Sequence, residues 1–284
     1  MAIRNILHNE LILFGDKGGV GKTTCAPATA IALLPKRTLL VSTDPAHSLG
    51  DCLGQEIGDE ITRVERAENL YALEISAGIE HLTRRERENL LSLPVPGADE
   101  VMGLKRLMDL MEEAAFEKYV LDTAPTGHAL RLLSMPDIFD EWINVFYDLR
   151  RKHRDYEKAF GRRDRADEFL VTLKTSTAKL RDLLRSQKTE FVVVTAAEYL
   201  VTEETKDIIS ELRSSGITMR HLIFNKLFPD LDSHFSKVRR QEEQRLVEET
   251  RSMLSQLQVT EVCLQPTEPR GIDNLRSFAS LLYS

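Results

Sequence analysis

The sequence predicts an α/β protein with a doubly wound, mostly parallel β-sheet. Three observations predict this class. Short continuous apolar runs recur along the chain, stretches with helical spacing separate them, and one run stops at a glycine-rich string that opens a helix. Continuous apolar strands are typical of parallel sheets, because helices cover both faces of such sheets.

The apolar runs predict five strands in chain order. These are residues 11–14 (LILF), 38–42 (TLLVS), a run that ends at 119–122 (YVLD), 191–195 (FVVVT) and 221–225 (HLIFN). A helix-compatible stretch, residues 23–34, follows the first strand and its glycines, so the local order is strand, turn, helix.

Two segments do not follow this α/β alternation. Residues 62–115 have a mostly helical pattern, and residues 136–187 contain two stretches with amphipathic helical spacing. We therefore expect one domain over residues 1–284, with an inserted helical subdomain built from about 62–115 and 136–187.

Composition limits the function. The chain has 284 residues and a formal net charge of -7, and its 42% hydrophobic and 29% charged residues are ordinary for a cytosolic globular protein. The acidic balance argues against a nucleic-acid partner, because phosphate neutralisation needs clustered Lys and Arg. No run approaches the roughly 20 apolar residues that span a bilayer, and the first ten residues lack a signal-peptide pattern. We expect a cytoplasmic protein that is not itself transmembrane.

The string Lys17–Thr24 (KGGVGKTT) has the composition of a phosphate-binding loop. Such a loop presents backbone N–H groups to phosphate at a helix N-terminus. The residues expected to bind nucleotide here are Gly18, Gly19, Val20, Gly21, Lys22, Thr23 and Thr24. Lys22 would reach the β- and γ-phosphates, and the Thr23 hydroxyl would coordinate Mg²⁺. The sequence therefore predicts a P-loop NTPase fold with ATP and Mg as cofactors.

Two positions depart from the standard loop. Asp16 stands where the usual motif has its first glycine, and its carboxylate would repel phosphate unless it faces away. Lys17 marks the deviant Walker A form, in which an additional lysine contacts phosphate across a dimer interface. We treat Lys17, Lys22 and Asp44 as catalytic candidates.

Two acidic residues follow predicted strands. Asp44 lies in STDPAHSLGD and Asp122 in LDTAPTGHALRLL, each at the carboxyl end of a strand, where open α/β sheets bind ligands. Asp122 would hold Mg²⁺, partly through water, and Asp44 would orient the attacking water beside the metal. Taken alone, each carboxylate is equally well explained as a helix cap.

These strings together resemble the family of arsenite-pump ATPases and tail-anchored-protein targeting ATPases. The resemblance continues through VTAAEYLVTEET (194–205), FNKLFP (224–229) and EPRGIDNL (268–275). It implies a homodimer that closes on Mg·ATP, with Lys17 reaching the partner's nucleotide, Asp44 positioning water and Asp122 supporting Mg²⁺. It also implies that Asn225 recognises adenine and that the segment near Pro266 lines the base. Independently, Asn225-Lys-Leu-Phe lacks the acidic residue of the guanine-reading N-K-x-D motif, which favours ATP.

The cysteines separate this chain from some members of that family. Its three cysteines, Cys25, Cys52 and Cys263, do not match the metalloid site of arsenite pumps and contain no Cys-x-x-Cys pair. A prokaryotic-type member without the zinc clamp of eukaryotic targeting factors is therefore indicated.

A targeting factor needs an apolar groove for its client. Candidate groove residues are Met102, Leu104, Met108, Met111, Trp142 and Phe146, although an ordinary core-facing helix shows the same spacing. The main hypothesis is a dimeric switch ATPase that targets tail-anchored or other hydrophobic membrane-protein clients. The alternatives are an energising ATPase subunit of an arsenite or other anion pump, with a membrane-bound partner, and a nucleotide-gated regulatory module with little hydrolysis.

Overall fold

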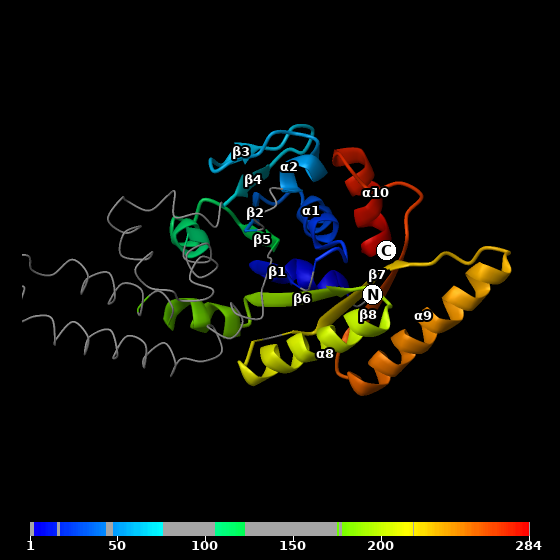
Figure 1. The fold of residues 1–284 in the computed structure, drawn as a ribbon. Coiled ribbons are helices and arrows are strands. Elements are labelled where there is room, and N and C mark those ends of the chain that lie inside the picture. The colour runs from blue at the N-terminus through cyan, green and yellow to red at the C-terminus, as the bar shows by residue number, and fades with distance from the viewer. Residues whose placement is uncertain are drawn as a thin grey trace, which may run out of the picture.

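The computed structural model describes residues 3–15, 18–43, 48–75, 106–122, 175, 178–217 and 219–283. An eight-stranded sheet in the order β3-β4-β2-β5-β1-β6-β7-β8 forms the centre of this part of the chain (Figure 1). The strands are β1 (Leu11–Gly15), β2 (Thr38–Ser42), β3 (Thr62–Arg63), β4 (Leu70–Glu74), β5 (Lys118–Asp122), β6 (Thr189–Thr195), β7 (His221–Leu227) and β8 (Gln258–Cys263). All neighbouring strands pair in parallel except β3 and β4, so the doubly wound, mostly parallel sheet is confirmed.

Helices cover both faces of the sheet (Figure 1). One apolar core packs η1 (Ile3–His8), α1 (Lys22–Ala32), α2 (Ser48–Leu53) and α10 (Ile272–Leu282) against one face. The second core packs α8 (Tyr199–Ser214), α9 (His234–Met253) and helical residues 106–112 and 178–185 against the other face. Because both faces are buried, the central strands are continuous apolar runs rather than alternating ones.

The register of three strands places the site. Phe14 of β1 and Ser42 of β2 both pair with Asp122 of β5. The three strands therefore end at the same level, and the segments that follow them leave from one edge of the sheet. Thr43, the residue after β2, donates its backbone N–H to the Asp122 carbonyl at 3.0 Å. The phosphate loop and the two segments that carry Asp44 and Asp122 thus leave the sheet from neighbouring strands.

The structure differs from the sequence-based expectation in three strands. The expectation of a mostly helical segment over residues 62–115 is wrong at its beginning, where β3 and β4 form. Strand β4 has the sequence LYALE, which is rich in helix formers, and its four buried residues show that packing in the sheet overrides that propensity. The sequence does not predict β8 either. This strand is mostly exposed or half-buried, so its sequence, QVTEVC, lacks the continuous apolar run by which the five expected strands were identified.

The five expected strands all form, with boundaries within a few residues. β2 coincides with the expected range, while β1, β5, β6 and β7 extend beyond theirs. Within the described ranges, no helix combines the length and apolar character that crossing a bilayer requires. Most of the expected helical subdomain lies outside the described residues, so its division from the sheet stays a prediction.

Candidate nucleotide-binding site

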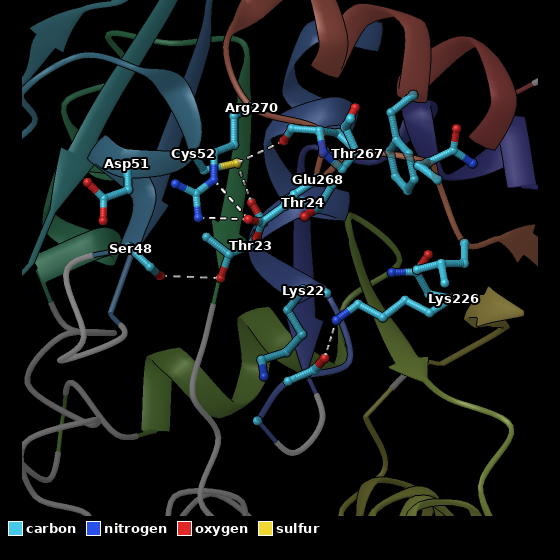
Figure 2. Close-up of a pocket in the computed structure, with 18 of the residues that line it drawn as sticks. Lys22, Thr23, Thr24, Ser48, Asp51, Cys52, Lys226, Thr267, Glu268 and Arg270 are labelled. Atoms are coloured by element: carbon cyan, nitrogen blue, oxygen red, sulfur yellow. Dashed lines mark hydrogen bonds and ion pairs between the residues drawn. The ribbon is translucent and has the colours of Figure 1, made fainter.

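A cavity of about 490 Å³ lies at the carboxyl edge of the sheet (Figure 2). The phosphate loop and the start of α1 form its floor, α2 lies on one side and the end of β7 on the other, and the segment after β8 completes it. The residues that line it are Gly18, Gly19, Gly21, Lys22, Thr23, Thr24, Ser48, Asp51, Cys52, Asn225, Lys226, Cys263, Leu264, Gln265, Thr267, Glu268, Pro269, Arg270 and Phe278.

The loop adopts a conformation that glycine allows. Gly19 and Gly21 have φ angles of 84° and 99°, in the left-handed region that side chains disfavour. Gly21 is also the N-cap of α1, so the loop leads directly into the helix N-terminus. A Cβ atom on Gly21 would lie 2.3 Å from the Asn225 amide nitrogen, so only glycine fits. Lys22, the first helical residue, is 6% exposed.

Two side chains of β7 form hydrogen bonds with the backbone of the phosphate loop. The Asn225 amide donates a hydrogen bond to the Val20 carbonyl at 2.9 Å, and the Lys226 ammonium donates one to the Gly19 carbonyl at 2.6 Å. In a trans peptide, the carbonyl and the following N–H point in opposite directions. Two carbonyls that face β7 therefore turn the next two N–H groups away from it, as an anion-binding nest requires.

Helix α2 brings polar groups to the other side of the loop. The buried Glu74 carboxylate at the end of β4 accepts the backbone N–H groups of Leu49 and Gly50 at 2.9 and 3.0 Å. A carboxylate at this end of a helix satisfies N–H groups that have no intrahelical acceptor. The helix fixed in this way places the Ser48 hydroxyl 3.5 Å from the Thr23 hydroxyl.

Asp122 places a buried carboxyl group near the site. Its side chain is fully buried at the end of β5. Desolvation, followed by the charge of Asp122, raises the pKa of the Cys52 thiol to about 12. Burial and then the same carboxylate also raise the pKa of Cys25. The buried carboxylate therefore lies close enough to α1 and α2 to act on groups at the phosphate loop.

The segment after β8 forms the far wall of the cavity. Arg270 donates a hydrogen bond from its Nε to the Glu268 carboxylate at 2.9 Å, and its terminal nitrogen forms an ion pair with the same carboxylate oxygen at 2.7 Å. Figure 2 shows this pair beside Cys52. Gln265 and Thr267 line the cavity on either side of Pro266, which is not itself among the lining residues.

The donor set fits a magnesium ion that arrives with its nucleotide. In the described ranges, no group of three or more His, Cys, Asp or Glu side chains is placed to hold a metal ion. Mg²⁺ in phosphate-transfer sites is held by few protein ligands together with phosphate oxygens and water. The Thr23 hydroxyl at the cavity and the buried Asp122 carboxylate are oxygen groups of the hard type that would suit such an ion.

Most sequence-predicted residues fall into three groups; of the other two, Asp122 ends β5 and, like Pro266, is not among the residues that line the cavity. The structure brings Gly18, Gly19, Gly21, Lys22, Thr23, Thr24 and Asn225 to one cavity, with Val20 held by Asn225. Asp16, Lys17, Asp44, Met102, Leu104, Trp142 and Phe146 lie outside the described residues. Met108 is 6% exposed within the core, and Met111 packs partly buried against it, so these two residues do not form an open groove.

Sequence analysis missed several lining residues. Ser48 and Asp51 lie within the string STDPAHSLGD and Cys52 follows it, so their place after Asp44 was a usable signal. Lys226, Glu268 and Arg270 lie in strings that carried the family resemblance, but no chemistry was assigned to them. Their roles depend on the direction in which their side chains point. At the end of a strand, sequence spacing does not determine this direction.

A phosphate loop between a central strand and a helix, with acidic strand ends beside it and a cavity above it, defines a P-loop NTPase. Residues 9–284 match the model of the anion-transporting ATPase family. The chain is 32% identical over 312 residues to the "ATPase ASNA1 homolog 1" of Paramecium tetraurelia, covering 99% of this chain and 95% of the relative.

Two further relatives agree with this family. The "ATPase GET3" of Mycosarcoma maydis is 32% identical over 309 residues, covering 99% of this chain and 93% of its own length. The "ATPase GET3B" of Arabidopsis thaliana is 32% identical over 320 residues, covering 95% and 78%. The chain therefore belongs to the anion-transporting ATPase family and is an ATPase.

Proposed function

We propose that this ATPase is a Mg-dependent, dimeric switch that couples ATP binding and hydrolysis to the handling of hydrophobic membrane-protein segments. The cavity that joins the phosphate loop to Asn225 and the segment after β8 carries the nucleotide part of this proposal. Phosphates would lie on the loop and the N-terminus of α1, where N–H groups and the helix dipole favour anions. Lys22 would contact the β- and γ-phosphates.

Adenine would lie at the β7 end of the cavity. The Asn225 amide nitrogen donates a hydrogen bond to the Val20 carbonyl. The Asn225 amide oxygen would therefore be the atom that accepts a hydrogen bond from the base. Adenine offers an exocyclic amine as a donor, whereas guanine presents a carbonyl at the equivalent position. Phe228, at the position of the guanine-reading acid, instead packs against Phe235 with ring centroids 5.6 Å apart. This arrangement supports ATP over GTP, with the segment near Pro266 closing over the base.

Catalysis in this site would rest on positioning and charge. Thr23 and, partly through water, Asp44 and Asp122 would hold Mg²⁺, which neutralises charge that develops on the phosphates. Asp44 would orient the attacking water. Lys17 would reach the nucleotide of a second copy in a homodimer. We expect slow turnover by the isolated protein, because such switches use hydrolysis for timing.

The proposed client is the hydrophobic segment of a tail-anchored or similar membrane protein, met in the cytoplasm. Membership in the same family as the ASNA1 and GET3 ATPases supports this choice. Since Met108 lies in the core and Met111 packs against it, the groove would depend on Met102, Leu104, Trp142 and Phe146. Co-purification with a tail-anchored segment should fall sharply for Leu104→Asp/Phe146→Asp, while ATP hydrolysis persists.

A second candidate function is the energising subunit of an anion or arsenite pump. The description of the matching family as anion-transporting supports it. This function predicts that arsenite or another oxyanion stimulates hydrolysis several-fold and that a membrane-bound partner is required. Unchanged hydrolysis over a series of oxyanions, together with capture of a hydrophobic segment, would favour targeting.

The first test is Mg-dependent ATP binding and hydrolysis by the purified protein beside Asp44→Asn. Hydrolysis that the substitution abolishes while binding persists would support the switch. Binding without hydrolysis by the unmodified protein would replace the switch with a nucleotide-gated module. No binding would show that Asp16 disables the loop and would overturn the proposal.

A further inference from the structure

The side chain of Lys226 lies against the phosphate loop at Gly19 and Gly21. Its ammonium lies 2.6 Å from the Gly19 carbonyl, and its stem passes over Gly21, where an added Cβ would lie 3.7 Å from the lysine Cε. The residue is exposed and lines the cavity. Figure 2 shows its side chain extended across the loop toward this carbonyl.

A local irregularity of β7 makes this arrangement possible. Phe224 pairs with Glu261 and Leu227 with Cys263, so β7 has one residue more than β8 between these pairs. Lys226 has a φ of 61°, a left-handed conformation that residues with a Cβ atom rarely adopt. In a regular strand, consecutive side chains point to opposite faces. Here, Asn225 and Lys226 are consecutive and both bind the phosphate loop.

We propose that Lys226 is a positioning residue that sets the phosphate loop for anion binding and supplies, through its alkyl stem, a platform for the nucleotide base. The inference rests on the proposed nucleotide function. The ammonium fixes the Gly19 carbonyl toward β7 and thereby directs the Val20 N–H to the phosphate side of the loop. A loop held in this way before binding loses less conformational entropy when the phosphates arrive.

The platform follows from the course of the side chain. With the ammonium held at the loop, the methylene groups are stretched along the β7 side of the cavity, close to Asn225. Lysine stems pack against flat apolar surfaces while the charged end keeps its polar partner. A purine ring whose edge meets Asn225 would therefore lie with one face on this stem.

Two substitutions separate the two roles. Lys226→Met removes the ammonium and keeps a stem, whereas Lys226→Ala removes both. Mg·tripolyphosphate and Mg·ATP are the two probes, because only the second carries a base. Titration calorimetry should show that Lys226→Met raises the dissociation constants of both probes by about tenfold, the effect of one charged hydrogen bond. Lys226→Ala should raise the constant for Mg·ATP by about a further three- to fivefold and leave that for tripolyphosphate at the methionine value.

Lys237→Met is the matched control, because Lys237 is an exposed lysine of α9 that pairs with Asp232 and does not line the cavity. It should bind both probes like the unmodified protein. Without ligand, Lys237→Met should unfold at the temperature of the unmodified protein, and the two Lys226 variants should unfold at similar temperatures to each other, because both lack the same hydrogen bond. Lys226→Arg should restore most of the tripolyphosphate affinity.

The outcomes also separate this inference from the proposed function. Unchanged affinity of Lys226→Met and Lys226→Ala for both probes would overturn the inference while ATP binding stands. Equal loss for the two probes in Lys226→Ala would overturn the platform alone. If the unmodified protein binds tripolyphosphate but not ATP, the proposed function is overturned. The tripolyphosphate affinity of Lys226→Met would then still test whether the ammonium positions the phosphate loop. Binding of neither probe would overturn both.

Discussion

The thiol of Cys52 donates a hydrogen bond to the Thr23 carbonyl, with 3.0 Å between sulfur and oxygen. In an α-helix, this carbonyl would accept the N–H of residue 27, four positions on. Residue 27 is Pro27, which lies inside α1 and has no N–H to give. Cys52 of α2 thus satisfies a carbonyl that the sequence of α1 leaves without its helical donor, next to the Thr23 hydroxyl.

Cys52→Ala should therefore lower the free energy of unfolding by about 1–2 kcal/mol, through the lost hydrogen bond and the small cavity. Urea denaturation measures this change. The hydrogen-bond part should vanish in a Pro27→Ala background, because alanine restores the helical donor to Thr23. A double-mutant cycle should thus give a coupling energy between the two positions. Strict additivity of the two substitutions would contradict the role assigned to Cys52.

Gly21→Ala should destabilise the protein more than Gly19→Ala. Both residues have left-handed φ angles, but a Cβ on Gly19 meets nothing within 4 Å, whereas one on Gly21 meets the Asn225 amide nitrogen at 2.3 Å. The shared backbone strain amounts to about 1–2 kcal/mol. Urea denaturation without nucleotide isolates the clash as the difference between the two variants, and Asn225→Ala should reduce that difference. Equal stabilities of the two alanine variants would show that the loop moves away from β7 at little cost.

Cys263 should be the thiol that reacts first in the folded protein. Cys25 and Cys52 are buried, and Cys263 is exposed and lines the cavity. The Cys52 pKa of about 12 leaves only about one thiolate in ten thousand at pH 8. Alkylation followed by mass spectrometry should find modification at Cys263.

Nucleotide should protect this cysteine. Cys263 lies at the end of β8, beside the segment proposed to enclose the base. Mg·ATP should therefore slow its alkylation several-fold, and Mg·tripolyphosphate should slow it less. Equal rates with and without Mg·ATP would place the base elsewhere.

The sequence was sufficient for the centre of the sheet and the phosphate loop. Central strands of a parallel sheet are buried on both faces, so a continuous apolar run such as FVVVT identifies β6 without further context. The glycines of the loop predict its conformation equally well, because few other residues adopt the left-handed φ angles of Gly19 and Gly21.

The edges of the sheet and the second layer of the site did not follow from sequence. β4 consists largely of helix-forming residues, and its strand conformation depends on pairing with β2 along its whole length. The inward turn of Lys226 depends on one additional residue in β7 relative to β8. Both features arise from pairing between segments far apart in the chain, which local propensity and spacing do not contain.

Glu74 links the sheet edge to the nucleotide site, and its substitution should affect both stability and binding. Its carboxylate, 4% exposed, is a charge-assisted acceptor for two N–H groups at the start of α2. Glu74→Gln keeps an acceptor oxygen and should cost about 1 kcal/mol of unfolding free energy. Glu74→Ala leaves the N–H groups without this acceptor and should cost about 2–4 kcal/mol.

The consequence for binding follows from what α2 carries. Ser48, Asp51 and Cys52 all line the cavity, so a displaced α2 should weaken Mg·ATP binding in Glu74→Ala more than in Glu74→Gln. Glu68→Gln, an exposed glutamate just before β4, is the matched control and should change neither property. Stability lost without any change in the Mg·ATP dissociation constant would show that α2 is not part of the nucleotide site, because its anchoring would then be irrelevant to the ligand.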